Sequence, residues 1–207
     1  MRILSVNVGK SFEADWAGKL GRTAIDKRPV THRVEVTGHG LAGDERADKK
    51  HHGSPDHAVY SYAREDYDWW ASELGRPLRA GQFGENLTTS GVDLDGALLG
   101  ERWRVGTALL EVTGPRIPCV VFRNWMDEPG WLKRFTAAGR TGAYLRVVEP
   151  GLLGQGDEVE IVFRPELGAT VTDAFRARHG DKNAMQRILT IPDHDPKWDA
   201  LAARTLT

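Results

Sequence analysis

The stretch RWRVGTALLEVT, residues 102–113, decides the fold class, because it holds two short apolar runs separated by Gly106 and Thr107. Short runs rich in valine and leucine and bounded by glycine are typical of β-strands. The same pattern extends in both directions, from residue 1 to about residue 165. Strands are predicted at 3–8, 30–36, 58–62, 102–105, 108–113, 143–148 and 158–163. So many short strands favour a closed or nearly closed β-barrel, since closure removes exposed edges.

A few helices are expected among these strands. One is predicted from four apolar residues at helical spacing: Tyr67, Trp70, Ala71 and Leu74. These positions share one face of a helix and are interpreted as core. Two further helices are predicted at 120–125 and 131–138. The sequence therefore predicts a mainly β domain with a few helices.

The last forty or so residues differ in character from the rest. Three short helical patterns follow residue 168, and Thr170 with Asp173 resembles a capping box at the start of the first. We expect a barrel domain over 1–165 and a three-helix extension over 168–207. A segment this short buries too little to be secure alone, so it is expected to pack on the barrel or on a second copy of the chain, as in a homodimer.

Composition excludes several classes of protein. The 207 residues are 40% hydrophobic and 28% charged, which is ordinary for a globular protein, and no segment approaches the roughly 20 apolar residues of a membrane helix. The formal net charge of −1 argues against a nucleic-acid partner. The chain opens with a predicted strand and not with the apolar region of a signal peptide, so a cytoplasmic location is expected.

A polar loop over residues 43–57 is the first candidate for chemistry. It contains three histidines and three aspartates and little apolar content. One interpretation is a solvated surface loop ending in a turn, and another is a metal site. A zinc hydrolase is not favoured, because a helical pair of histidines four residues apart with a glutamate between them is absent and adjacent histidines point apart on an extended segment.

The run 81–88 is the second candidate. Its glycines allow close approach to the backbone, while Glu85, Asn86 and Thr88 supply polar groups. A turn before a strand has the same appearance, so this run alone does not establish a site.

The single cysteine, Cys119, is the third and strongest candidate. A solitary cysteine forms no internal disulfide and is usually a small buried hydrophobe. Here Pro115 and Pro118 stiffen the backbone, Arg116 and Arg123 bring positive charge, and a predicted helix begins just after the sulfur. These neighbours favour a thiolate that acts as a metal ligand or a nucleophile.

Taken together, four motifs in this order and at these separations resemble the MOSC domain family: Gly43-Asp44, His52-Gly53, residues 83–87 and residues 115–119. More closely, the chain resembles the bacterial YiiM-like subgroup, whose members carry a C-terminal three-helix extension like 168–207. The resemblance covers essentially the whole chain and implies a β-barrel fold. Ser54 departs from the usual pattern, in which a second glycine is common.

The resemblance also implies a cofactor and a reaction. Cys119 would ligate the molybdenum of a molybdenum cofactor (molybdopterin), for which a soft thiolate is suitable. Members of the subgroup reduce N-hydroxylated compounds such as hydroxylamino purines, with electrons from a separate reductase. His52 would act near the metal with Asp56 fixing its tautomer. The expected cofactor-binding residues are Glu85, Asn86, Arg116, Arg123 and Arg146.

Three other functions remain compatible with these residues. Cys119 is also suited to carry a persulfide during cofactor maturation, which needs an external sulfur source. As a nucleophile with His52 and Asp56 it would serve a thiol hydrolase. A non-enzymatic cofactor carrier would bind molybdopterin without turnover.

Overall fold

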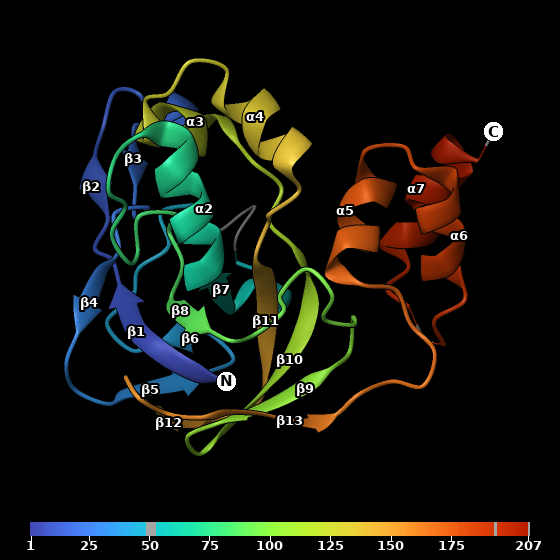
Figure 1. The fold of residues 1–207 in the computed structure, drawn as a ribbon, viewed down its shortest axis with the longest axis horizontal. Coiled ribbons are helices and arrows are strands. Elements are labelled where there is room, and N and C mark those ends of the chain that lie inside the picture. The colour runs from blue at the N-terminus through green and yellow to red at the C-terminus, as the bar shows by residue number, and fades with distance from the viewer. Residues whose placement is uncertain (49–52, 193, 207) are drawn as a thin grey trace.

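A curved, mainly antiparallel sheet forms the body of the molecule in a computed structural model that describes residues 1–48, 53–192 and 194–206 (Figure 1). The eight strands of this sheet, in spatial order, are β13 (Val159–Phe163), β9 (Arg102–Val105), β10 (Ala108–Pro115), β11 (Ala143–Glu149), β7 (Val59–Ala63), β8 (Leu87–Ser90), β1 (Arg2–Val8) and β4 (Arg28–Val30). Two small sheets accompany it, one made of β12 (Gly151–Leu153), β5 (Val34–Thr37) and β6 (Gly40–Leu41), the other of β2 (Phe12–Glu13) and β3 (Arg22–Thr23).

The main sheet rolls toward closure without completing a barrel. An isolated antiparallel bridge joins Arg2 to Glu158, and the main-chain nitrogen of Val159 donates to the oxygen of Met1 at 3.0 Å. The start of β1 therefore meets the start of β13, while β4 lies beyond β1 at the end of the sheet. The predicted mainly β class is confirmed, with a rolled sheet in place of a fully closed barrel.

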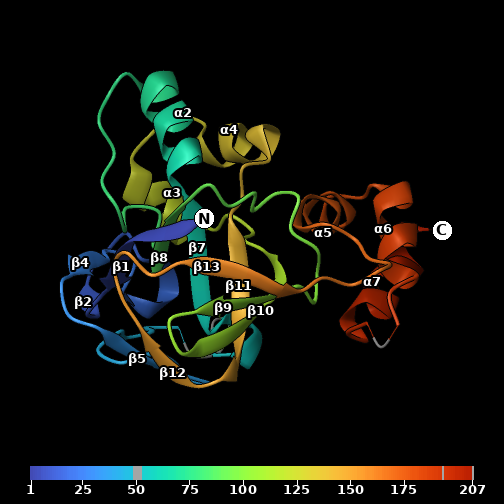
Figure 2. The same cartoon turned by 60° about the horizontal axis from the view of Figure 1, so that its bottom comes forward.

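Three helices cover one part of this sheet, as Figures 1 and 2 show. They are α2 (Arg64–Leu74), α3 (Val120–Met126) and α4 (Trp131–Ala138). Their aromatic side chains pack with those of the sheet in one buried cluster: Tyr62, Tyr67, Trp70, Phe83, Phe122, Trp131 and Phe135. The predicted helices at these positions are confirmed, and no helix among the described residues is long and apolar enough to cross a membrane.

The C-terminal extension also forms as predicted. It consists of α5 (Val171–Arg178), α6 (Lys182–Leu189) and α7 (Lys197–Thr205), which lie together at one side of the sheet (Figure 1). Both hydrogen bonds of the predicted capping box are present at Thr170 and Asp173. Met185 and Trp198 belong to the same buried cluster as Val112 of the sheet. The division into domains at about residue 165 stays a prediction.

One predicted strand is wrong. Residues 30–36 do not form a single strand, because β4 pairs with β1 in the main sheet while β5 pairs with β12 and β6. Between them the chain bends at Thr31 and His32, and the guanidinium of the next residue, Arg33, binds Asp157 at 2.8 Å. This ion pair fixes the bend to the loop between β12 and β13.

Candidate functional site

Cys119 lies on the wall of a cavity of about 570 Å³. Three residues separate it from the end of β10, and it directly precedes α3. Its backbone is extended and its side chain is half-buried. The other walls come from five parts of the chain: residues 17–27, 44–48, 57–60, the turn with Gly84 and Asn86, and Tyr144 on β11. A cavity of this size matches those that hold small molecules and cofactors.

Arg116 is a buried cation in the wall of this cavity, 7% exposed. Its Nη1 donates to the main-chain oxygen of Phe83, and its guanidinium carbon lies 4.0 Å from the ring centroid of Phe122. Burial acts to lower the pKa of Arg116, but the neighbouring Tyr60, Tyr144 and Cys119 outweigh it, so that this pKa lies above its ordinary value. A permanent positive charge thus lies close to the thiol.

A buried ion pair between Lys27 and Asp44 forms part of the same wall. Burial lowers the pKa of Lys27, and the contact with Asp44 opposes this shift. The carboxylate of Asp44 also accepts from Asn86 Nδ2 at 2.9 Å and from the nitrogen of Gly9 at 2.8 Å. Sequence reasoning missed Lys27, because no motif surrounds it.

Aromatic and imidazole rings line the side of the cavity formed by the main sheet. The Tyr60 hydroxyl donates to the oxygen of Thr141 at 2.7 Å, and the ring centroids of His57 and Tyr144 are 4.6 Å apart. Burial raises the pKa of Tyr144 above its ordinary value. Its phenol is therefore protonated at neutral pH and is a hydrogen-bond donor there.

Glu85, an expected cofactor-binding residue, is fully buried behind the cavity wall. It accepts from Tyr67 Oη at 2.7 Å, from Thr88 Oγ1 at 2.7 Å and from the nitrogen of Gly81 at 2.5 Å. Burial raises the pKa of this carboxyl, and these hydrogen bonds oppose the shift. Glu85 therefore holds the turn that presents Gly84 and does not itself line the cavity.

Glycine is required at position 81 of this turn. Gly81 has φ +79°, and a Cβ there would lie 2.3 Å from the oxygen of Lys27. The backbone of the turn thus packs directly against the segment that supplies Lys27 to the cavity.

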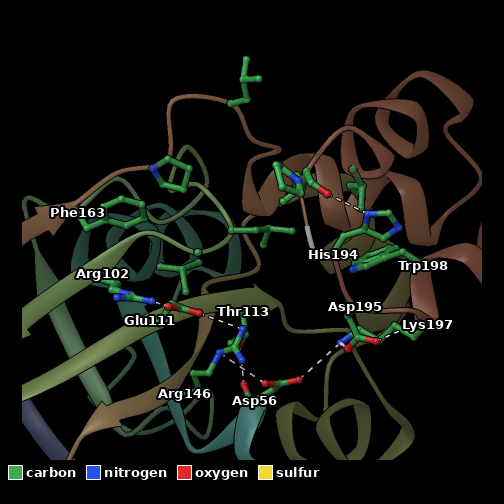
Figure 3. A pocket seen from close by; sticks show the side chains of 18 residues that line it. Asp56, Arg102, Glu111, Thr113, Arg146, Phe163, His194, Asp195, Lys197 and Trp198 are labelled. Atoms are coloured by element: carbon green, nitrogen blue, oxygen red, sulfur yellow. Dashed lines mark hydrogen bonds and ion pairs between the residues drawn. The ribbon is translucent and has the colours of Figure 1, made fainter.

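Two predicted site residues, Asp56 and Arg146, meet in a different cavity (Figure 3). This second cavity, of about 670 Å³, lies between β9–β11 and the C-terminal extension. Arg146 Nη2 is 3.0 Å from Glu111 Oε1, and Arg146 Nε is 3.8 Å from Asp56 Oδ1. Lys197 at the start of α7 approaches the other oxygen of Asp56 at 3.8 Å. Asp56 and His57 thus face two different cavities.

The two remaining predicted residues lie elsewhere. Arg123 is exposed on α3 outside the cavity wall, with its Nε donating to Asn124 at 3.0 Å. His52 lies outside the described residues. Among the predicted residues, the structure therefore brings Cys119, Asn86 and Arg116 together in one cavity. Asp56 and Arg146 lie in the other cavity.

The described residues of the Cys119 cavity fit a molybdenum cofactor. Among them, no group of three or more histidine, cysteine, aspartate and glutamate side chains is arranged to hold a metal ion. One thiol beside a buried guanidinium instead suits a soft metal whose other ligands come with the cofactor. Arg116, Lys27 and the amide of Asn86 supply polar partners for an anionic, hydrogen-bonding molecule. The size of the cavity, its single thiol and its positive charge thus all fit a molybdenum cofactor.

Comparison with known proteins identifies the family. The pattern of the MOSC domain matches residues 48–160, which include Cys119, Arg116 and the turn with Asn86. The chain therefore belongs to the MOSC domain family, whose members are associated with binding of the molybdenum cofactor.

Within the family the chain is YiiM-like. YiiM of Escherichia coli (strain K12) is 36% identical over 181 residues, which are 85% of this chain and 81% of that protein. YflK of Bacillus subtilis (strain 168) is 36% identical over 201 residues, covering 96% of this chain and 91% of that protein. The crystal structure of YiiM from Geobacillus stearothermophilus has a TM-score of 0.80 at 29% identity, covering 100% of this chain and 99% of that one.

A longer relative carries a functional name. A protein named reductase from Gibberella moniliformis (strain M3125 / FGSC 7600) is 30% identical over 200 residues, which are 93% of this chain and 35% of that protein. The chain thus spans about a third of this relative.

Proposed function

We propose that this protein is a molybdenum-cofactor-dependent reductase of N-hydroxylated compounds that takes its electrons from a separate donor. The observation that carries the proposal is the position of the chain's only cysteine, on the wall of a cofactor-sized cavity beside the buried Arg116. Membership of the MOSC domain family and the relative named reductase support it.

Each residue of the cavity has a proposed role. Cys119 is the protein ligand to molybdenum, and Arg116 with Asn86 holds the polar edge of the cofactor. When bound, the cofactor would supply the two-electron redox chemistry that removes oxygen from nitrogen. His52 remains the proposed proton donor near the metal.

The reaction consumes two electrons and two protons. A substrate R–NHOH gives R–NH₂ and water, as the N–O bond breaks and the nitrogen and the departing oxygen are both protonated. Tyr144 is a fixed hydrogen-bond donor in the cavity, since burial raises the pKa of its phenol. It orients the polar end of the substrate without losing its own proton.

Metal and pterin analysis of protein made in a molybdate-supplied host tests the proposal. We expect near-stoichiometric molybdenum in the wild type and a loss of tenfold or more in Cys119→Ala, because the variant lacks the only soft protein ligand in the cavity. Wild-type holoenzyme should also reduce a panel of N-hydroxylated purines and amidines with reduced methyl viologen.

A matched control separates loss of the ligand from loss of the fold. Cys119→Ala should keep the thermal unfolding midpoint of the wild type within about 3 °C, since the thiol is only half-buried and its loss leaves a small void. Molybdenum in both proteins would refute ligation by Cys119. No molybdenum in either would favour sulfur transfer, for which labelled sulfur from a cysteine desulfurase should reach Cys119.

A further inference from the structure

Three exposed apolar side chains gather where the Cys119 cavity opens to solvent. Leu20 is 51% exposed, Ile117 38% and Val120 48%, and all three line the cavity. They come from separate parts of the chain, Leu20 from the 3₁₀ turn Gly18–Leu20 and the other two from the segment around Cys119. Exposed apolar side chains gathered around a site opening are typical of an interaction surface.

Three exposed cations accompany them. Lys19 precedes Leu20, Arg22 lies on β3, and Arg123 is one helical turn from Val120 on the same face of α3. None of these three forms an ion pair with another residue in the part of the chain that the structure describes. Together, these apolar and basic side chains are called the rim: Lys19, Leu20, Arg22, Ile117, Val120 and Arg123.

One acidic residue near the rim acts on one of its cations, since the charges of Glu45 and Arg22 attract each other. Glu45 and Asp48 also line the cavity, and both are engaged within the chain. Glu45 pairs with Lys10 at 3.2 Å and accepts from the nitrogen of Ser11 at 2.9 Å. Lys19 and Arg123 therefore remain as the positive charge that accompanies the three apolar side chains.

Electrons for the proposed reaction have to arrive at this opening. The 207 residues contain one cysteine, which is too few to hold an iron–sulfur cluster by thiolates. Electron transfer between proteins uses small, short-lived contacts in which opposite charges steer the encounter. An apolar patch with cations around it matches that requirement.

We propose that the rim is the docking surface for an acidic one-electron redox protein, which delivers two electrons in successive encounters to the Cys119 cavity. This inference rests on the proposed function. Each turnover then oxidises two molecules of the reduced donor and converts one R–NHOH with two protons into R–NH₂ and water. The contact is small and transient, so the opening is free for substrate between encounters.

Steady-state kinetics of the holoenzyme with two electron donors test the inference. The protein donor is a reduced flavodoxin, which is acidic, and the small donor is reduced methyl viologen, a monocation that needs no docking surface. In the double variant Lys19→Glu/Arg123→Glu we expect the KM for flavodoxin to rise at least about tenfold at low ionic strength. The difference should shrink as salt screens the charges.

A control variant carries the same change of charge far from the rim. Lys182→Glu/Arg178→Glu alters exposed residues of the C-terminal extension, which Figure 1 shows at the opposite side of the sheet from β2 and β3. This control should keep the wild-type KM for flavodoxin. Because Lys19 lines the cavity, the KM for flavodoxin of each protein is compared with the viologen-driven turnover of the same protein, which reports on the cavity without the docking step.

The outcomes separate the inference from the function on which it rests. An unchanged KM for flavodoxin in the rim variant, an equal rise in the control, or a wild type that uses viologen but not flavodoxin would each overturn the docking surface. Absence of turnover with viologen in the wild-type holoenzyme would instead overturn the proposed function.

Discussion

Asp95 is a partly buried acid in the loop between β8 and β9. Burial raises its pKa to about 6, with Asp66 and Asp93 adding to the shift and Arg140 opposing it. In the unfolded state the pKa of this carboxyl is near 3.8. Between about pH 4 and pH 6, Asp95 is therefore protonated in the folded state and ionised in the unfolded state. The resulting stabilisation is fully present below about pH 4 and is lost as the pH rises through 6.

Asp95→Asn removes this dependence, because an amide does not ionise. At pH 8 the unfolding midpoint of the variant should lie a few degrees above that of the wild type, a gain in stability of at most about 3 kcal/mol. This gap between the two midpoints should close toward pH 4. Thermal unfolding followed by circular dichroism from pH 4 to pH 8 measures it. A gap that does not vary with pH would rule out the ionisation of Asp95 as its cause.

The site residues show what single positions in a sequence reveal. Cys119, Arg116 and Asn86 were predicted together and lie around one cavity. Asp56 and His57 are neighbours in the 3₁₀ turn Pro55–His57, which packs against β11, yet they face different cavities. Lys27 reaches the site through its ion pair with Asp44 and the packing of the turn at Gly81 on its backbone, which no local pattern indicates.

At the scale of elements, the start of α5 is the clearest case of a local signal that the structure realises. Thr170 Oγ1 accepts from the nitrogen of Asp173, and Asp173 Oδ2 accepts from that of Thr170, both at 3.0 Å. Thr170→Ala should lower the free energy of unfolding by about 1 kcal/mol, since it removes this cap. Thr170→Ser keeps the hydroxyl, so its free energy of unfolding in urea should stay near that of the wild type. An equal loss of stability in both variants would show that the methyl group, and not the cap, is responsible.

Most helices and strands follow from periodicity, and the exceptions have physical causes. The helical spacing of apolar residues predicts α2, helices are also expected at the positions of α3 and α4, and apolar runs predict most of the main sheet. β8 is absent from the predicted strands, because its sequence LTTS is polar although most of it is buried. The split between β4 and β5 depends on pairing with strands distant in sequence, which local propensity does not encode.

At the scale of the whole molecule, the extension and the sheet share one buried cluster. Trp198 of α7 is 5% exposed within it. Trp198→Ala should therefore lower the free energy of unfolding by about 3–5 kcal/mol. We expect the entire chain to unfold in a single transition, whose urea midpoint is lowered in this variant. Urea unfolding followed by both fluorescence and circular dichroism checks this, with Trp198→Phe as the milder control. Two separate transitions, only one of them shifted, would instead support independent domains over 1–165 and 168–207.

The pairing of β1 has a consequence for biosynthesis. Arg2 pairs with Ser90 of β8 and bridges to Glu158, so β1 leaves the ribosome before these two partners are translated. During that interval its apolar residues and unpaired main chain are open to other nascent chains and to chaperones. Premature termination anywhere before residue 158 would leave this strand without part of its pairing, which makes the fragment prone to aggregation and a target for proteolysis.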